Sequence, residues 1–304
     1  MVNKPASLLD VFLTALVPII WGSTYLVTTE FLPPDIPLTA AALRALPAGL
    51  ILLAFQRYIP QGQWWWKAAL LGVLNIGAFF YFLFLAAYHL PGGIAALIMS
   101  IQPVIVLIYG ILLFRNPVRA TQILACLCAA TGVALIVLRP DVMLNAKGVM
   151  AGVCGAFSMA TGMVLAKKFG RPDNMPLLAL TGWQLTFGGL ALLPFALTTE
   201  TLPETLSLRN VGGMAYLSLL GALLTYALWF RGIARLPALT VSFLSLLSPL
   251  SATALGFVFL GQDLTWAQLF GGALVLFSVY LAQPQVRLFG FATLTRKLRI
   301  SDLS

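Results

Sequence analysis

The residue with the clearest chemical potential is Arg44, which lies within the apolar run 37–56. A charge inside such a run is costly and usually faces a cavity or a partner. Arg44 could bind an anionic or carbonyl-bearing substrate, pair with Glu30 or Asp35, or extend toward a membrane surface. No apolar run has a carboxylate at its middle, which argues against a direct proton relay there, although Glu30, His89 or a substrate proton could serve.

Aromatic and hydroxyl residues gather in the first apolar run, as Trp21-Gly22-Ser23-Thr24-Tyr25. Trp21 and Tyr25 share one helical face, because residues four apart stack on each other. We expect this segment to line a pore. The alternative is a small-residue packing face, since Ser and Thr hydroxyls in lipid can bond to their own helix. The corresponding segment of the second half is 157–161, which contains Ser158.

Other polar and aromatic residues complete the predicted cavity wall. They are Asn75, Phe79, Gln102, Trp183, Gln184, Tyr226, Trp229 and Ser248. Aromatic walls with few polar groups suit a flat or amphipathic organic ligand. The alternative for any single ring is a lipid-facing position, and for Trp183 it is packing.

One segment of the chain occurs twice, 146 residues apart, which indicates a duplicated unit. The matching residues are Pro91, Pro103, Gly110 and Gln122 in the first copy and Pro237, Pro249, Gly256 and Gln268 in the second. Proline lacks a backbone donor and clashes with the carbonyl four residues earlier, so it kinks a helix. We expect Pro103 and Pro249 to act as hinges beside a binding site; a packing kink is the alternative.

The composition indicates a polytopic membrane protein. Of 304 residues, 60% are hydrophobic and 9% are charged, against about 25% charged in soluble domains. The net charge of +9 would suggest nucleic acid in a soluble protein, but the basic residues fall between apolar runs, so no nucleic-acid partner is expected. Three cysteines lie inside apolar runs, far from the single histidine, which argues against a disulfide, a metal site or a cofactor.

Ten runs are long enough to cross a bilayer, which takes about 20 residues. They are approximately 10–30, 37–56, 67–89, 92–114, 119–138, 148–167, 176–198, 211–235, 238–260 and 265–283. With the N-terminus inside, fourteen Lys and Arg residues fall on the cytoplasmic side and three outside. This bias predicts that both termini lie in the cytoplasm, and the ten apolar runs predict an all-α membrane protein.

Two units of five helices must enter the membrane in opposite directions, because five is odd. We therefore expect inverted repeats at 10–138 and 148–283, a linker at 139–147 and a basic cytoplasmic tail at 284–304. In transporters built this way, the substrate site lies near the midplane where the repeats meet.

These features resemble the EamA family of the drug/metabolite transporter superfamily over residues 10–283. The resemblance rests on WGSTY in the first run, Arg44 within RALPAG, and the repeated Pro…Pro…Gly…Gln segment. It implies a ten-helix carrier with a central cavity, in a family whose members often export amino acids or other small metabolites. The run WGSTYLVTTEFLPPDIPLTAAALRALPAG resembles the PecM branch, which is associated with export of the pigment indigoidine. The glutamate usual after the repeated helix is missing, since these turns read Arg115-Asn116-Pro117 and Gly261-Gln262-Asp263.

The sequence thus predicts an exporter of small organic metabolites that works by alternating access. Its expected partners are a small-molecule substrate and the lipid bilayer, and the protein would be a monomer or homodimer. Rival hypotheses are an importer or exchanger of the same fold and a membrane sensor without flux. An intramembrane enzyme is disfavoured, because there is neither a GxSxG turn after a strand nor a paired-histidine or acidic metal motif.

Overall fold

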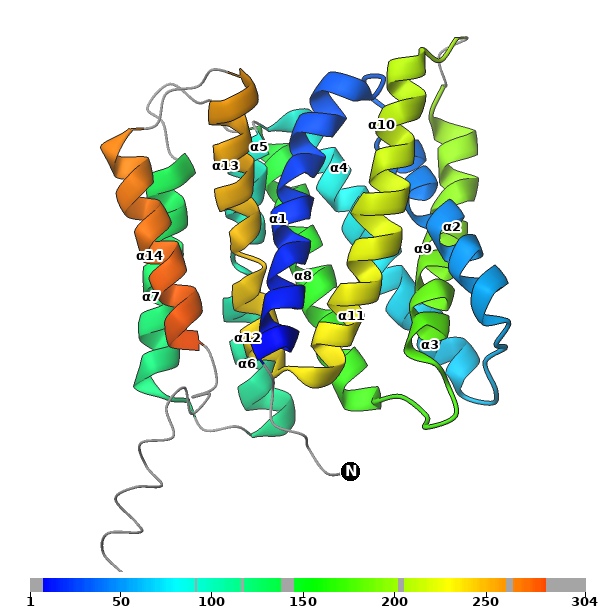
Figure 1. Ribbon diagram of the computed structural model, residues 1–304, viewed down its shortest axis with the longest axis horizontal. Helices are drawn as coiled ribbons and strands as arrows, with labels where there is room; N and C mark the ends of the chain where they lie inside the picture. The colour runs from blue at the N-terminus through cyan, green and yellow to red at the C-terminus, as the bar shows by residue number, and fades with distance from the viewer. Residues whose placement is uncertain are drawn as a thin grey trace, which may run out of the picture.

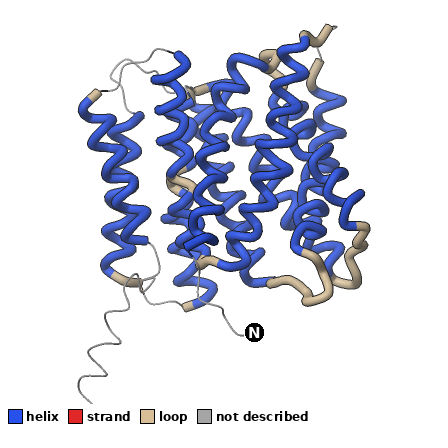
Figure 2. Tube along the Cα trace, viewed as in Figure 1, coloured by secondary structure: helices blue, strands red, loops and turns tan. Residues whose placement is uncertain are grey.

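The computed structural model describes residues 8–90, 92–115, 118–137, 145–201, 205–260 and 265–282. Every regular element in these ranges is a helix (Figure 2). Most of the linker 139–147, the tail 284–304 and the turns at 116–117 and 261–263 lie outside the described residues.

The helices of the first half occupy the expected apolar runs. They are α1 (Leu8–Phe31), α2 (Pro37–Gln56), α3 (Trp64–Gly72), η1 (Val73–Ala78), α4 (Phe79–His89), α5 (Gly92–Met99), α6 (Gln102–Phe114) and α7 (Ala120–Val137). Those of the second half are α8 (Ala146–Phe169), α9 (Leu177–Thr199), α10 (Leu208–Ser218), η2 (Leu219–Leu224), α11 (Thr225–Arg235), α12 (Ala238–Leu244), α13 (Leu247–Leu260) and α14 (Trp266–Ala282). The elements α3, η1 and α4 follow one another without a break, as do α10, η2 and α11.

Within the described residues, seven segments are long and apolar enough to cross a membrane. They include the continuous helices Trp64–His89 and Leu208–Arg235. The helices α6 and α14 and the described apolar part of α7, Ala120–Leu135, are shorter. The structure confirms an all-helical architecture for this part of the chain, and ten crossings stay a prediction.

Polar groups at the helix ends explain several boundaries. Pro37 lies in the first turn of α2, where its missing N–H costs nothing. The Glu200 carboxylate then accepts hydrogen bonds from the backbone N–H groups of Leu38 and Thr39, both at 2.7 Å. The Asn145 side chain caps α8 in the same way. Glu200 therefore ties the end of α9 to the start of α2.

The helices expected at 92–114 and 238–260 are each broken into two. Non-helical residues separate α5 from α6 at Ser100–Ile101 and α12 from α13 at Ser245–Leu246. Pro103 and Pro249 consequently lie in the first turn of the second helix, where a missing N–H is tolerated. The expected kinks appear as short interruptions of the regular helix, which begin three residues before Pro103 and four residues before Pro249.

Equivalent elements of the two halves pack against each other: α2 contacts α9, and α7 contacts α14. Small residues allow the close approach, since a Cβ added to Gly132 of α7 would lie 2.7 Å from the carbonyl oxygen of Gly271 in α14. In Figure 1, α1 and α7 run upward from the edge where the chain begins, whereas α8 and α14 run downward. Helices that correspond in the two halves thus point in opposite directions.

Candidate functional site

A cavity of about 50 Å³ lies between helices of both halves of the chain. The helices α1, α2, α4, α5, α6, α8 and α13 contribute its walls, together with the breaks before α6 and α13. Its lining residues are Trp21, Thr24, Tyr25, Arg44, Phe79, Leu83, Ala96, Met99, Ser100, Gln102, Ala156, Met159, Ser245, Ser248 and Pro249. Both broken helices reach this cavity at their breaks, which places the predicted hinges beside it.

Eight residues named from the sequence line this cavity. They are Trp21, Thr24, Tyr25, Arg44, Phe79, Gln102, Ser248 and the hinge residue Pro249. Seven other lining residues were missed: Leu83, Ala96, Met99, Ser100, Ala156, Met159 and Ser245. Small and apolar residues in a spanning helix resemble ordinary packing residues, so they gave no signal. Ser100 and Ser245 could have been found as the polar residues just before each repeated proline.

Arg44 is buried at the cavity wall, with 1% of its surface exposed. Its Nη2 donates to the carbonyl oxygen of Gly221 at 2.7 Å, and its Nη1 lies 3.4 Å from the Thr24 hydroxyl. The guanidinium carbon lies 4.4 Å from the centroid of the Phe80 ring, within range of a cation–π contact. The Nε atom has no partner among the described residues. Arg44 is thus held by neutral groups and keeps one donor free.

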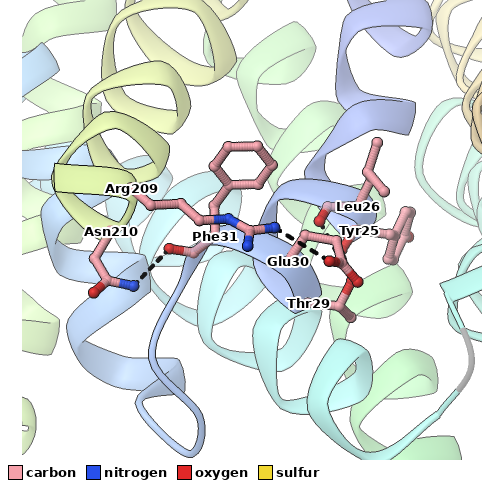
Figure 3. Close-up of polar contacts among 7 residues, drawn as sticks. All are labelled: Tyr25, Leu26, Thr29, Glu30, Phe31, Arg209 and Asn210. Carbon is pink, nitrogen blue, oxygen red and sulfur yellow. Dashed lines mark hydrogen bonds and ion pairs between the residues drawn. The ribbon is translucent and has the colours of Figure 1, made fainter. Parts of the chain in front are cut away.

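Two of the three interpretations of Arg44 disagree with the structure. Glu30 pairs with Arg209 at 3.3 Å (Figure 3), and no ion pair joins Arg44 to Asp35 in the described part of the chain. Arg44 is also too deeply buried to extend to a surface. A role toward a bound substrate is the interpretation that stays open.

The carbonyl of Gly221, in η2, is the acceptor that holds Arg44 in place. It also accepts hydrogen bonds from Trp21 Nε1 at 3.1 Å and from the Thr225 hydroxyl at 2.8 Å. A π-helix bonds each carbonyl to the residue five positions on, which releases carbonyls from the regular α-helical pattern. Side chains supply the donors here, and sequence reasoning missed Gly221 because the functional group belongs to the backbone.

The second π-helix, η1, begins at Val73, and η2 begins at Leu219, the same 146-residue separation as the repeat. In η1 the Leu74 carbonyl accepts a hydrogen bond from the Ser158 hydroxyl at 2.7 Å. The Asn75 amide donates to Gln184 Oε1 at 3.0 Å. Asn75, Ser158 and Gln184 therefore make their hydrogen bonds at or with η1, and they are not among the residues that line the central cavity.

Tyr226 and Trp229 form an aromatic layer behind Trp21. Their ring centroids lie 5.1 and 4.9 Å from that of Trp21, and neither side chain is exposed. They support the cavity wall without lining it. The Trp229 N–H and the Tyr226 hydroxyl have no hydrogen-bond partner among the described residues, and we have no physical account of this.

The remaining predicted residues lie elsewhere. Ser23 faces a groove toward α10, where its hydroxyl shares a hydrogen bond of 2.7 Å with the Tyr216 hydroxyl. Trp183 donates its indole N–H to the Tyr58 carbonyl at 2.8 Å and packs edge-on against Trp65, so its role is packing. Pro103 is buried but is not among the lining residues of the cavity.

Figure 3 shows how the C-terminal end of α1 is joined to α10. The Arg209 guanidinium contacts the Glu30 carboxylate, and the Asn210 amide donates to the carbonyl of Phe31 at 2.9 Å. The Thr29 hydroxyl bonds within α1, to the Tyr25 carbonyl at 3.2 Å. These contacts hold α1 and α10 together above the cavity.

The central cavity offers a positive charge and hydrogen-bond donors within an apolar wall. No carboxylate is among its described lining residues. The Gln102 Nε2 atom is buried without a partner, as Arg44 Nε is. Because unpaired donors in a low-dielectric site are costly, they favour a ligand that brings acceptor oxygens.

The model of the EamA-like transporter family matches this chain at residues 8–138 and 146–282. The chain is 45% identical to Protein PecM of Dickeya dadantii, covering 94% of this chain and 95% of that protein. It is 27% identical to a "Probable amino-acid metabolite efflux pump" of Salmonella typhimurium, covering 96% and 98%. It is also 27% identical to the inner membrane transporter YedA of Escherichia coli K12, covering 86% and 87%.

A solved crystal structure has the same fold, with a TM-score of 0.72 at 16% identity, and covers 90% of this chain and 97% of its own. The family match spans both halves of the chain, which agrees with the two-repeat architecture. The protein is therefore a multi-pass bacterial membrane transporter that belongs to the EamA-like transporter family and, within it, to the PecM-like branch.

Proposed function

We propose that this protein exports small organic metabolites across the bacterial inner membrane by alternating access. The substrate is an amino-acid-like, drug-like or pigment compound that binds in the central cavity. Membership of a transporter family supports transport, and the relative named as an amino-acid metabolite efflux pump supports the outward direction.

The proposed topology has ten crossings in two inverted five-helix units, at 10–138 and 148–283, with both termini in the cytoplasm and the protein a monomer or homodimer. The opposite directions of α1 and α8, and of α7 and α14, support the inversion (Figure 1). The excess of Lys and Arg on one side supports the orientation.

Arg44 is the observation that carries the proposal. Its charge is buried at the cavity wall, its bonded partners are neutral, and its Nε is free. A buried charge without a counter-ion is unfavourable, and a carboxylate or carbonyl brought by the substrate would compensate it. Arg44 would also make the site selective for ligands with hydrogen-bond acceptors, because a ligand without acceptors leaves the Arg44 donors unpaired.

Everted inner-membrane vesicles test the proposal, since export then becomes uptake into the vesicle lumen. We would measure flux of radiolabelled amino acids and flat aromatic amides, with and without a pH gradient. Wild-type vesicles should accumulate at least one of them. Arg44→Gln should reduce that flux about tenfold or more, because one charge-assisted hydrogen bond contributes ~1.5–3 kcal/mol.

Arg171→Gln is the matched control, because Arg171 is exposed in the loop after α8. Wild-type flux retained in Arg44→Gln would overturn the role of Arg44. Binding without flux for every compound would favour a sensor, and counterflow without net accumulation would favour an exchanger.

A further inference from the structure

A second cavity, of about 420 Å³, is lined by residues near the end of α6, the end of α8 and the start of α12. These helix ends lie at the edge of the bundle where α1 begins (Figure 1). We call this cavity the vestibule; its walls include Val106, Gly110 and Phe114 of α6, Lys167 of α8 and Leu239 of α12. The same three helices contribute to the central cavity or end at it. The vestibule and the central cavity therefore lie along the same three helices.

Short helical steps separate the two cavities. On α6, Val106 of the vestibule lies about one turn beyond Gln102 of the central cavity. On α8, Lys167 lies about two turns beyond Met159. A solute moving from one cavity to the other would thus travel only a few turns along these helices.

Gln102 and Ser245, which both line the central cavity, are joined by a hydrogen bond of 3.3 Å. Gln102 directly follows the break in its helix, and Ser245 is part of the other break. The Ser245 hydroxyl also donates to the Ser242 carbonyl at 2.6 Å, so little bonding is left for Gln102. A small movement at either break would open this contact.

Lys167 is the one charged residue among the described residues that line the vestibule. No ion pair between described residues includes it. A cation in the last turn of a helix is favourable in itself, but the exposed neighbour Lys168 fills the same role in water. Lys167 instead is partly buried over apolar walls, where an anion would find a counter-ion and a surface for its hydrocarbon part.

We propose that the vestibule is the loading site of the transporter and takes an amphipathic organic anion, with Lys167 as its counter-ion. The anion then passes the contact between Gln102 and Ser245 and reaches Arg44. This assignment rests on the proposed export function. The transported solute is the occupant, because both cavities lie along α6 and α8, and Arg44, a second cation without an ion pair to a described carboxylate, lines the central cavity.

A thiol-protection assay tests this on the full chain in nanodiscs of zwitterionic phosphatidylcholine. Cys126, Cys128 and Cys154 are replaced by alanine, and Ala238→Cys places a reporter thiol in the vestibule wall. The probes are 1-naphthoate and its uncharged analogue 1-naphthamide. Naphthoate should slow labelling by N-ethylmaleimide, and naphthamide should not.

Lys167→Gln should weaken the apparent affinity for naphthoate about fivefold or more, as expected for loss of one partly screened ion pair. Lys168→Gln, the matched control, should keep it. Equal protection by naphthamide, or full protection in Lys167→Gln, would overturn the assignment. The last experiment uses nanodiscs that contain phosphatidylglycerol. If this lipid alone protects the thiol in a Lys167-dependent way, and naphthoate adds no further protection, the vestibule is a lipid site and the loading-site assignment is wrong.

The assay needs no flux, so the two proposals fail separately. If Lys167→Gln transports substrate with an unchanged KM, only the assignment of the vestibule as the loading site would be overturned. Protection by naphthoate in a protein that transports nothing would overturn only export.

Discussion

Arg44 owes its position to groups that are distant in sequence. Its charge is compensated by the carbonyl of Gly221 and the face of Phe80 and by no described carboxylate. The planar guanidinium can bond Gly221 with one nitrogen and still offer Nε to a substrate. If substrate binding depends on Arg44 bonding Gly221 with one nitrogen and the substrate with another, a different cationic side chain at position 44 should not replace it.

Arg44→Lys tests that dependence. The ammonium group keeps the charge but has no fixed fork of donors, so it cannot hold Gly221 and a substrate in the same geometry. We expect KM to rise about tenfold, for a loss of ~1.4 kcal/mol, with the protein still folded. Transport assays and thermal melting measure the two effects. Arg209→Lys, in the exposed pair with Glu30, is the control and should change KM and the melting temperature little. An unchanged KM in Arg44→Lys would contradict the prediction.

The two π-helices are the elements that shape the polar sites. Both occur at the same place in the repeat, and each directs a backbone carbonyl to a side chain of another helix. At η2 the donors are Arg44 and Trp21, and at η1 the donor is Ser158. The symmetry lies in the backbone, while the side chains that use it differ between the halves.

Deleting Leu220 from η2 should convert this turn into regular α-helix. One residue fewer returns the carbonyls to bonds with the residue four positions on, and α10 and α11 keep their relative rotation. Arg44 then loses its acceptor, so transport should fall at least about tenfold, as for a charge-assisted hydrogen bond. Circular dichroism would check that helix content is kept. Leu220→Ala is the control, and a deletion variant with normal flux would contradict the assignment.

The broken helices are the elements we expect to move. Pro249→Ala restores a backbone donor at the start of α13 and allows α12 and α13 to join. Transport should fall while the melting temperature stays equal or rises, because an alanine stabilises a continuous helix by up to ~3 kcal/mol relative to proline. Pro103→Ala should behave alike. Pro194→Ala, at an exposed site in α9, is the control; equal effects there would argue against a hinge.

Across the whole molecule, α1 is held at both ends. At the end where the chain begins, Asp10 pairs with Arg231 at 2.7 Å and Arg235 at 3.1 Å, both in α11. At the other end Glu30 pairs with Arg209 of α10. In the transport cycle we propose, the cavity opens first to one side of the membrane and then to the other. We therefore expect the ion pairs at one end of α1 to break in one state and those at the other end to break in the other state.

The proposed orientation can be measured with single cysteines in the chain whose three native cysteines are alanine. Thr201→Cys and Lys147→Cys should react with a membrane-impermeant maleimide in intact spheroplasts. Gln61→Cys and Asp173→Cys should react only in everted vesicles. All four positions are exposed, so burial does not limit labelling. Reaction of both pairs from one side would contradict the inverted ten-helix arrangement.

The sequence by itself determined the membrane class, the position of the helices and the duplication. These depend on local properties: the length of apolar runs, the prolines and charges that end them, and a repeat with a fixed period. The expected run 37–56 coincides with α2 for this reason. The Trp21–Tyr25 segment and Arg44 were also found, because polar groups inside an apolar run stand out.

Only the tertiary structure decided which polar groups meet. Asn75, Ser158 and Gln184 were expected around the cavity, yet Asn75 bonds to Gln184 and Ser158 bonds to the Leu74 carbonyl of η1. The partner of Arg44 is a backbone carbonyl 177 residues away, which no side-chain pattern reveals. Such contacts depend on how each helix is rotated against its neighbours. That rotation is set by packing between the two halves together, and local sequence does not encode it.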